Sequence, residues 1–555
     1  MISLILNWGD KMPKHQEGPE KLLMRNCIIR EKAGLWHENG ALVIKDGYIE
    51  ACGSRKEVLS RYGDYPDINL KGKTVLAGFN DAHLHLYQLG KDLSRPDLSQ
   101  IEDLNHLKEK LLSWLEHNDP APEELIRGAR LDDSRLPEGR LPDRMQLDRI
   151  IENRPLLLER ICYHAAAVNT KALKIAGIDR NTPDPPGGRI GRDKEGSPDG
   201  RLFDSAVDLV KKNFPSPSIS RRKKYYRRAG RKALSCGVTS LTTDDLAAEA
   251  GPAKTLRACR KYSSESRAAP RLFIQQRVKE KEDINWLQEN SRPTGQGDLS
   301  LRFGPIKIML DGTLGAETAA LSIPYRNSEN RGDLLMNKEK LKNILHTAEK
   351  GGFSADIHVI GDRAIDTVIS SYKDLKGTNR EISPPRMVHC QIPRQSQLDY
   401  LGERGFRAII QPVFVASDWK PARKKLPRDL LSLSHGWNSM LKAGMKLAAG
   451  SDAPIESIDP LPGIDCAVNR QDEQGKPEQG FLPGEKISLE QALMLYTRAG
   501  AAFSGEDDFK GTLSSGKLAD LAVINASPRR IKKDEIRELS VIKTFLAGME
   551  VYSGR

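Results

Sequence analysis

The sequence of 555 residues predicts an α/β fold, a (β/α)8 TIM barrel that carries a small composite β-sandwich and one inserted subdomain. Three observations predict it. Apolar runs of strand length alternate with charged, helix-like stretches through the middle of the chain, which is typical of parallel strands joined by crossover helices. Eight such runs can be identified, the number of strands in a TIM barrel. The two chain ends share another pattern, with short apolar-polar runs broken by Gly, Asn and Asp.

The two chain ends are expected to form one β-sandwich between them. Residues 22–77 contain several strand-like runs, and the dipeptides Asn39-Gly40 and Asp46-Gly47 have the composition of hairpin turns. The last residues of the chain return to the same pattern. We therefore assign residues 1–74 and 501–555 to the sandwich.

The barrel is expected to begin with a strand in residues 75–90 and to continue through residues 221–500. Each predicted strand is an apolar run followed by a turn or by a helix-like piece such as KEKLKNILHTAEKGG, which ends in Gly. The eight runs are VLAGFNDAHLH (75–85), VTSLTT (238–243), RLFIQQ (271–276), IKIML (306–310), FSADIHVI (353–360), RMVHCQI (386–392), RAIIQPVFV (407–415) and MKLAAGSD (445–452).

A long gap separates the first two barrel strands. We interpret residues 91–220 as an inserted subdomain near the barrel mouth, because they contain the Pro- and Gly-rich stretch 182–200 and break the strand-helix rhythm. The gap ends in the basic run, residues 220–234, SRRKKYYRRAGRKAL. We interpret the basic run as a solvated helix face rather than a nucleic-acid site, since Tyr225-Tyr226 is its only aromatic platform.

Composition excludes several classes of protein. The net charge of +12 arises from 87 Lys and Arg against 75 Asp and Glu, spread over the whole chain, so no nucleic-acid partner is expected. A hydrophobic content of 38% without an apolar run of about 18 residues indicates a globular protein with no membrane partner. Seven scattered cysteines without a CxxC pair and a first segment without signal-peptide features favour the cytoplasm. A homodimer is a further expectation.

The strongest local signal is the HxH pair in GFNDAHLHL. His83 and His85 stand at i and i+2, which places both imidazoles on one face of a strand. Side chains at the carboxyl end of a barrel strand line the active-site mouth, and neutral imidazole is the commonest metal ligand. Taken alone, the pair is a weak signal and favours ordinary polar residues at a strand end.

Other polar residues occupy the same place in their own strands. His358, His389 and Asp452 each end an apolar run. Lys307 lies within PIKIMLDG, and a lysine inside a barrel is unfavourable unless it is neutralised, paired or modified. Addition of CO2 to its amine would make a carbamate that can bridge two metals. Each residue alone could be a structural histidine or an ion-paired group, but the ordered set predicts a metal centre.

These stretches resemble the amidohydrolase superfamily, and within it the amidohydrolase-3 or YtcJ-like group, over roughly residues 22–550. The stretches that carry the resemblance are GFNDAHLHL (78–86), HAAAVNTKALKIAGI (164–178), TPDPPGGRIGRDKEGSPDGRL (182–202), IKIMLDGTLGAETAAL (306–321), HVIGDRAID (358–366), MVHCQI (387–392) and AAGSDAPIESIDPL (448–461). The resemblance implies the same barrel with a composite β-sandwich and a metal-dependent hydrolytic activity.

The resemblance also implies roles for individual residues. His83 and His85 would bind the more buried metal, and a carboxylated Lys307 would bridge it to a second one. His358 and His389 would hold the second metal, while Asp452 would bind the buried metal and transfer a proton. The expected cofactor is one or two divalent ions, zinc first, with iron, manganese and cobalt as alternatives.

Further residues are expected around the substrate. The resemblance makes His164 a substrate-facing and catalytic residue beside Asp452 and His389, and places Asp311, Asp362 and Arg363 at the mouth. The alternative for Asp362 and Arg363 is a structural ion pair. The family usually has Asp-Gly or Cys-Gly before this histidine and tryptophans near 130–140. This chain has Cys162-Tyr163 and LDDSRLPEGRLPD instead, which indicates a changed substrate pocket.

We therefore expect a metal-dependent hydrolase that acts on a carbon-nitrogen bond other than a peptide bond in a small molecule: an amide, a formamide or a cyclic amide. A deaminase or an esterase of the same superfamily, or a non-catalytic metal-binding member, remains an alternative. Nucleotide-binding and serine-hydrolase classes are disfavoured, because there is no GxGxxG after the first strand, no P-loop and no GxSxG.

Overall fold

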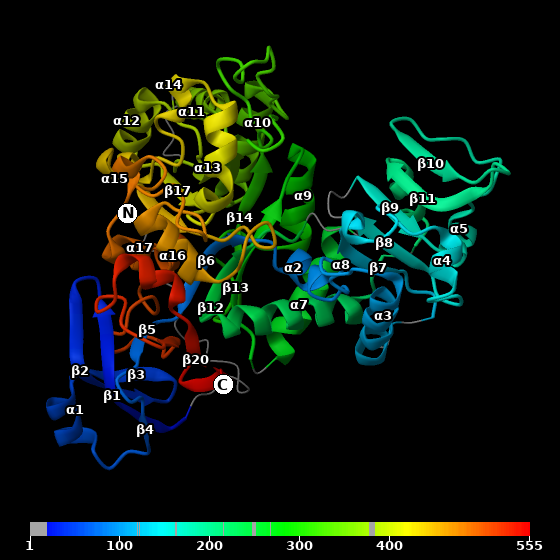
Figure 1. Cartoon of the computed structure of the whole chain (residues 1–555). Helices are drawn as coiled ribbons and strands as arrows, with labels where there is room; N and C mark the ends of the chain where they lie inside the picture. Colours follow the sequence, from blue (N-terminus) through cyan, green and yellow to red (C-terminus); the bar gives the residue numbers. More distant parts are fainter. Residues whose placement is uncertain are drawn as a thin grey trace. The chain divides into compact units, whose positions relative to one another are not determined.

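The computed structural model describes residues 19–118, 120, 122–160, 164–214, 216–246, 251–266, 268–376 and 383–554. The chain divides into two compact units, of which unit 1 comprises residues 1–89 and 222–555 and unit 2 comprises residues 90–221 (Figure 1). Unit 2 differs by one residue at each end from the insert expected from the sequence. The predicted absence of a signal peptide at the chain start and the Cys162-Tyr163 pair both fall outside the described residues.

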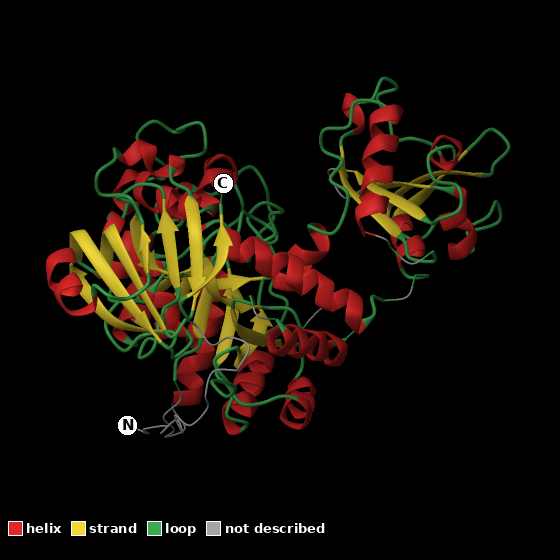
Figure 2. Cartoon of the chain, turned by 90° about the horizontal axis from the view of Figure 1, so that it is seen from below, coloured by secondary structure: helices red, strands yellow, loops and turns green. Residues whose placement is uncertain are grey.

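Unit 1 contains the predicted TIM barrel, an eight-stranded parallel sheet whose strands overlap all eight runs identified from the sequence. Figure 2 shows the strands of this unit with helices around them. Neighbouring strands pair in chain order. Most strand residues are buried, as expected for parallel strands covered on both faces. The strands are β6 (Phe79–Leu84), β12 (Val238–Thr243), β13 (Arg271–Arg277), β14 (Leu301–Met309), β15 (Ala355–Val359), β16 (Arg386–His389), β17 (Arg407–Ile410) and β18 (Lys446–Ala449).

The barrel closes where the chain after β18 meets the end of β6. The backbone N–H of Asp452 donates to the carbonyl of His83 at 2.8 Å, and the N–H of His85 donates to the carbonyl of Ala453 at 2.8 Å. Gly450 permits this approach, since a Cβ on it would stand 2.6 Å from the His83 nitrogen. The closure therefore places the polar ends of the first and eighth strands side by side.

Helices connect the barrel strands, as parallel pairing requires. Helix α10 shows how the sequence sets the ends of one of them: the Asn337 side chain accepts from the N–H of Lys340, and the helix ends before Gly351. The helices that start in unit 1 after β6 are α2 (Leu86–Asp92), α8 (Pro252–Glu265), α9 (Lys281–Asn290), α10 (Lys338–Lys350), α11 (Asp362–Lys376), α12 (Gln395–Glu403), α13 (Phe414–Lys425), α14 (Arg428–Leu431), α15 (Trp437–Lys442), α16 (Pro460–Asn469), α17 (Leu489–Leu495) and α18 (Arg498–Phe503), with short 3₁₀ turns at Pro483–Glu485 and Lys533–Glu538.

The basic run lies in helix α7 (Ile219–Ser235). One face of this helix is buried through Tyr226, Ala229 and Ala233, while Lys224 and Arg231 are exposed. This burial pattern supports the interpretation of a helix with a solvated basic face. The expectation that it binds no nucleic acid stays a prediction.

Strands from both chain ends pair in one mixed sheet, here called the terminal sheet. Its order is β21-β20-β19-β5-β1-β2-β3, with β4 beside β1. One core contains Ile44 and Ile49 from one end of this order and Leu521 and Phe545 from the other, so the sheet curves around its core. The expected sandwich is thus one continuous sheet. The elements are β1 (Lys21–Lys32), β2 (Leu35–Lys45), β3 (Tyr48–Ser54), helix α1 (Arg55–Tyr62), β4 (Asp67–Asn69), β5 (Thr74–Ala77), β19 (Leu521–Ile524), β20 (Val541–Leu546) and β21 (Met549–Ser553).

Two local expectations need correction. Asn39-Gly40 is not a turn but lies inside β2, where a Cβ on Gly40 would stand 2.8 Å from the Ile29 side chain. The turn between β1 and β2 lies at Gly34, whose φ of 75° suits glycine. The run 75–85 also divides at Gly78, because β5 belongs to the terminal sheet and only β6 to the barrel. Asp46-Gly47 does connect β2 to β3.

Unit 2 is built on a five-stranded sheet with the order β10-β11-β9-β8-β7. Leucines from the strands and from helix α3 form its core, among them Leu107, Leu111 and Leu156. The elements are α3 (Leu104–Asn118), β7 (Ile126–Leu131), a 3₁₀ turn at Asp133–Arg135, α4 (Arg144–Asp148), β8 (Leu156–Arg160), β9 (Ala165–Val168), α5 (Thr170–Ala176), β10 (Gly188–Arg192), β11 (Pro198–Asp204) and α6 (Ala206–Lys211).

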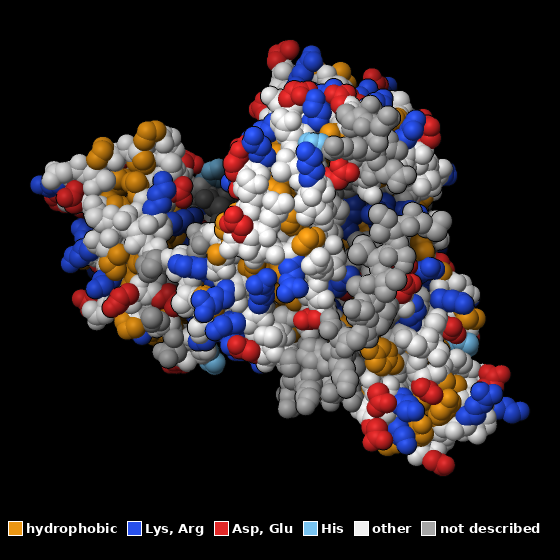
Figure 3. All heavy atoms as spheres, turned by 180° about the vertical axis from the view of Figure 1, so that it is seen from behind, with side chains coloured by type: hydrophobic (Ala, Val, Ile, Leu, Met, Phe, Trp, Pro, Cys, Tyr) orange, Lys and Arg blue, Asp and Glu red, His pale blue; other side chains and the backbone are white. Residues whose placement is uncertain are grey.

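One face of the molecule carries charges of both signs. Figure 3 shows Lys and Arg side chains spread over one face of the molecule with Asp and Glu among them. Among the described residues, no helix combines the length and the apolar character that a membrane crossing needs.

Candidate metal centre

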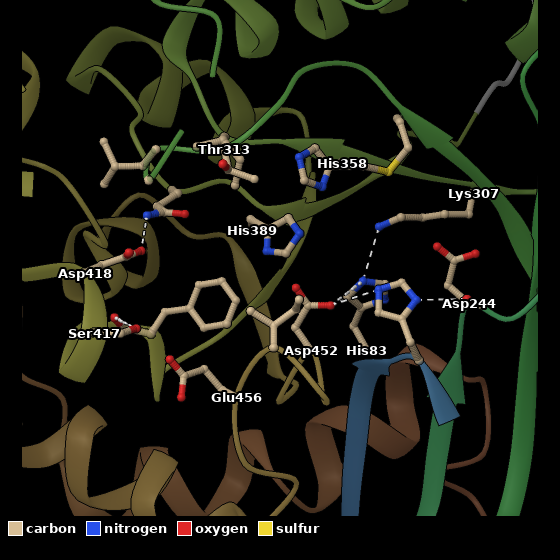
Figure 4. A pocket seen from close by; sticks show the side chains of 18 of the residues that line it. His83, Asp244, Lys307, Thr313, His358, His389, Ser417, Asp418, Asp452 and Glu456 are labelled. Carbon is tan, nitrogen blue, oxygen red and sulfur yellow. Dashed lines mark hydrogen bonds and ion pairs between the residues drawn. The ribbon is translucent and has the colours of Figure 1, made fainter. Parts of the chain in front are cut away.

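A cavity of about 340 Å³ opens in unit 1 where the barrel strands end. Figure 4 shows the polar side chains of its floor pointing toward one another. They come from the ends of five strands that are far apart in the sequence. They are His83, His85, Lys307, His358, His389 and Asp452, the six metal ligands expected from the sequence.

The Asp452 carboxylate lies at the centre of this group. Its Oδ1 is 3.1 Å from His85 Nε2 and 3.5 Å from His83 Nε2. Ligand atoms of His83, His389 and Asp452 all lie within 4.8 Å of one another. Oδ1 is nevertheless buried without a hydrogen-bond partner among the described residues. A buried oxygen that faces imidazole nitrogens without a well-aligned hydrogen bond is suited to a cation.

Three histidines are oriented by acceptors on their outer nitrogen. In each case an amide or backbone oxygen accepts from Nδ1, so Nε2 is the nitrogen that faces the cavity and can bind there once it carries no proton. The pairs are His83 with Gln275 Oε1 at 3.0 Å, His85 with the Asp244 carbonyl at 2.9 Å and His389 with Gln411 Oε1 at 2.6 Å.

His358 is oriented in the opposite sense. Its Nε2 donates to the carbonyl of Gly312 at 3.0 Å, which leaves Nδ1 as the nitrogen that can bind a metal. The ring centroids of His358 and His389 are 4.6 Å apart. The two imidazoles therefore lie next to each other in the cavity (Figure 4).

Lys307 is enclosed among these histidines. Its side chain is 1% exposed, and its Nζ lies 3.5 Å from His83 Nε2. Burial lowers the pKa of this amine to about 8. Among the described residues no carboxylate forms an ion pair with it, because the nearby Asp244 pairs with Arg277. Asp244, Asp356 and Asp452 act on the amine only through space, and the carboxylation of Lys307 stays a prediction.

Burial also sets the protonation of the histidines. It lowers the pKa of His83 and His389 well below the ordinary value and that of His358 to about 3. Burial alone would lower the pKa of His85 as well, but the Asp452 carboxylate outweighs it and raises this pKa to about 9. Three of the four imidazoles are thus neutral, the form that binds metals. Neutral imidazoles with a carboxylate fit a divalent ion such as zinc.

Comparison with known proteins identifies the family of this chain. Residues 68–552 match the sequence profile of the amidohydrolase family. The chain belongs to the amidohydrolase family. It is 30% identical to YtcJ of Bacillus subtilis (strain 168), a protein named as an amidohydrolase, over 92% of this chain and 96% of that protein. It is 26% identical to the N-substituted formamide deformylase of Arthrobacter pascens, over 92% of this chain and 94% of that enzyme.

A solved structure shares the architecture. An uncharacterized metal-dependent hydrolase from Pyrococcus furiosus superposes with a TM-score of 0.74 at 28% identity, over 92% of this chain and 99% of that one. The barrel expected from the sequence is therefore shown both by the strand order and by this likeness.

The remaining substrate residues expected for an amidohydrolase of this group are not among the described residues that line the cavity. His164 belongs to unit 2, where its side chain is 80% exposed and its Nδ1 lies 3.0 Å from Asp204 Oδ1. Its catalytic and substrate-binding roles stay predictions.

Asp311, Asp362 and Arg363 are not among the described residues that line the cavity. Asp311 is buried and accepts from the N–H groups of Ala320, Ile360 and Gly361, so it stabilises the loops after β14 and β15. Asp362 forms its ion pair with Arg394 at 3.0 Å rather than with Arg363. Asp311 Oδ1 also lies 3.8 Å from His358 Nε2, and the substrate-binding roles expected for these three residues stay predictions.

Sequence reasoning missed the residues that support and surround the ligands. Asp244, Gln275 and Gln411 also lie at strand ends, so the pattern that identified the histidines could have identified them. The outer cavity wall carries no such signal. Phe414 packs its ring parallel to His389, with centroids 6.0 Å apart, and Glu456 follows β18 by several residues.

Proposed function

We propose that this amidohydrolase is a metal-dependent hydrolase of carbon-nitrogen bonds other than peptide bonds in small molecules. The observation that carries the proposal is the convergence of four histidines, one buried lysine and one aspartate on the floor of a single cavity. The cavity volume of about 340 Å³ is at the lower end for small-molecule sites. The A. pascens relative, a formamide deformylase, supports an amide or formamide as the substrate class.

The residues divide into ligands and supports. His83, His85 and Asp452 would hold one divalent ion, and His358 and His389 a second, with a carboxylated Lys307 between them. When bound, such an ion lowers the pKa of a water molecule and polarises a carbonyl oxygen. Gln275 and Gln411 keep their histidines in the ligating tautomer.

Asp452 is the group best placed to move a proton. Its Oδ1 is buried beside two imidazoles and makes no hydrogen bond within the described chain. It would accept the proton of the attacking water and deliver it to the leaving nitrogen. His389 would take part as a ligand of the second ion, which it would hold near the carbonyl oxygen of the substrate, where negative charge develops during attack.

The outer wall restricts the charge of the substrate. Ser417, Asp418 and Glu456 line the cavity. Within the described chain, neither the Asp418 nor the Glu456 carboxylate forms an ion pair with a lysine or arginine. Gln391 donates to Asp418 Oδ2 at 2.7 Å. Two uncompensated carboxylates favour neutral or cationic substrates over anionic ones.

The test is a screen of the purified, metal-replete protein against N-acyl, N-formyl and cyclic-amide libraries, with esters and amino-heterocycles included. We expect hydrolysis of an amide or formamide. The His83→Ala variant should lack this activity, and chelation should remove it until metal is restored. Turnover of esters alone, or release of ammonia from amino-heterocycles alone, would instead identify an esterase or a deaminase. Full metal occupancy without turnover of any class would support a non-catalytic binding protein.

A further inference from the structure

A second group of metal-binding side chains lies in the terminal sheet, away from the barrel cavity. Glu31 is on β1, His37 on β2 and Cys52 on β3, three strands that pair side by side. One ligand atom from each of the three residues lies within 4.8 Å of the other two. None of the three contributes to the barrel centre.

The pairing register explains why these side chains meet. His37 pairs directly with Ile29, and residues directly opposite each other share a face of the sheet. Glu31 stands at an irregularity of the register between Arg30 and Lys32, and its carboxylate reaches the His37 ring from there. Ile29 belongs to the core of the terminal sheet, and Cys52 packs against that core. The three polar side chains thus stand at the edge of a face that otherwise carries apolar residues.

Their surroundings suit a bound cation. The side chains of Glu31 and His37 are 16% and 20% exposed, and Cys52 is a partly buried free thiol, so solvent reaches a site that is still largely enclosed. His37 Nε2 is 2.9 Å from Glu31 Oε2. The hydroxyl of Ser514 donates to the other oxygen, Oε1, at 3.3 Å, an outer contact of the kind that orients metal-binding carboxylates.

We propose that Glu31, His37 and Cys52 form a zinc site with a water in the fourth position. Zinc accepts a thiolate, an imidazole and a carboxylate in tetrahedral geometry with bonds of about 2.0 to 2.3 Å. The Cys52 thiol releases its proton to solvent when it binds, and the contact between His37 and Glu31 opens to admit the ion. The soft sulfur ligand makes the site selective for zinc over magnesium or manganese. Bound zinc cross-links β1, β2 and β3.

Cobalt provides a test that separates this site from the barrel. Co2+ replaces Zn2+ in such sites, and only a site with a thiolate ligand shows sulfur-to-cobalt charge transfer in the near ultraviolet. The ligands assigned to the barrel centre include no cysteine. We expect metal-free full-length protein titrated with Co2+ to develop this band, and Zn2+ to displace it.

Variants assign the band to its residues. Cys52→Ser should abolish the band. His37→Ala should lower the apparent affinity of the site for Co2+ at least tenfold. Cys236→Ser, which removes a buried thiol after α7, and His83→Ala, which removes a barrel ligand, should both retain it. Circular dichroism shows whether each variant is folded. A folded wild-type protein without the band, or a band that survives in Cys52→Ser, would overturn the proposal, and neither result affects the barrel hydrolase.

Discussion

Asp452 Oδ1 lies 3.1 Å from His85 Nε2, although the two residues follow the eighth and the first strand of the barrel. Backbone hydrogen bonds hold them there, because the N–H of Asp452 donates to the carbonyl of His83 and the N–H of His85 donates to the carbonyl of Ala453. The junction that closes the barrel is therefore also the junction that assembles the candidate centre.

Asp452→Asn should remove most of the activity without removing the fold. The amide keeps the shape of the carboxylate but cannot accept a proton, so we expect kcat/KM to fall about 10²- to 10⁴-fold. Steady-state kinetics on the substrate identified by the screen measure this loss. Asp429→Asn, at an exposed position on α14, serves as the control and should be unchanged. An active Asp452→Asn variant would remove this residue from the proton transfer.

Gln411→Leu should weaken metal binding at the barrel. Its Oε1 accepts from Nδ1 of His389 at 2.6 Å, and without it the ring loses its orientation and tautomer. We expect metal affinity to fall about 10- to 100-fold, measured by competition with a chromogenic chelator. A Cys52→Ser background removes the proposed second site from the titration. The exposed Gln395→Leu is the matched control, and equal affinities in both variants would contradict the supporting role.

Glu456→Gln should change substrate preference by charge. Removing one carboxylate from the cavity wall lessens repulsion of anions, so kcat/KM for an anionic substrate should rise about 3- to 10-fold relative to its neutral analogue. The ratio is measured at low and high salt, since screening should reduce the difference. Glu403→Gln, an exposed change on α12, should leave the ratio unaltered. An unaltered ratio in Glu456→Gln as well would exclude this electrostatic selection.

Unit 2 should lose stability in acid through Glu159. Burial alone would raise the pKa of this carboxyl, but Arg127, Arg95 and Lys211 outweigh burial and hold its pKa at about 2, below the ordinary 4.5. A depressed folded-state pKa stabilises the fold fully above pH 4.5, by about 3 kcal/mol, and that contribution is lost as pH falls from 4.5 toward 2.

Hydrogen exchange across β7 and β8 of the full-length protein measures this dependence. Protection in the wild type should fall between pH 5 and pH 3 after correction for intrinsic exchange. Glu159→Gln should lower protection at neutral pH and flatten the acid dependence, because the charge that titrates is gone. A Glu159→Gln profile parallel to the wild type would assign the acid sensitivity to other groups.

Much of the barrel could be predicted because buried parallel strands are continuous apolar runs, and all eight were recognised by that local property. The same property placed His83, His358, His389 and Asp452 at strand ends. The local pattern gave a wrong prediction where contacts between residues far apart in the sequence determine the structure. Asn39-Gly40 has the composition of a turn, yet the contact between Gly40 and Ile29 requires a glycine within a strand.

The order of residues along the chain was enough to specify the fold class and which side chains lie at the ends of strands, since both follow from short-range periodicity and burial. Two features depended on the folded molecule. One is which nitrogen of each histidine faces the cavity, and the other is the contact of Asp311 with backbone amides. The meeting of Glu31, His37 and Cys52 depended on it as well. Hydrogen bonds and side-chain contacts between distant segments arise only when the strands pair, and no local pattern in the chain encodes them.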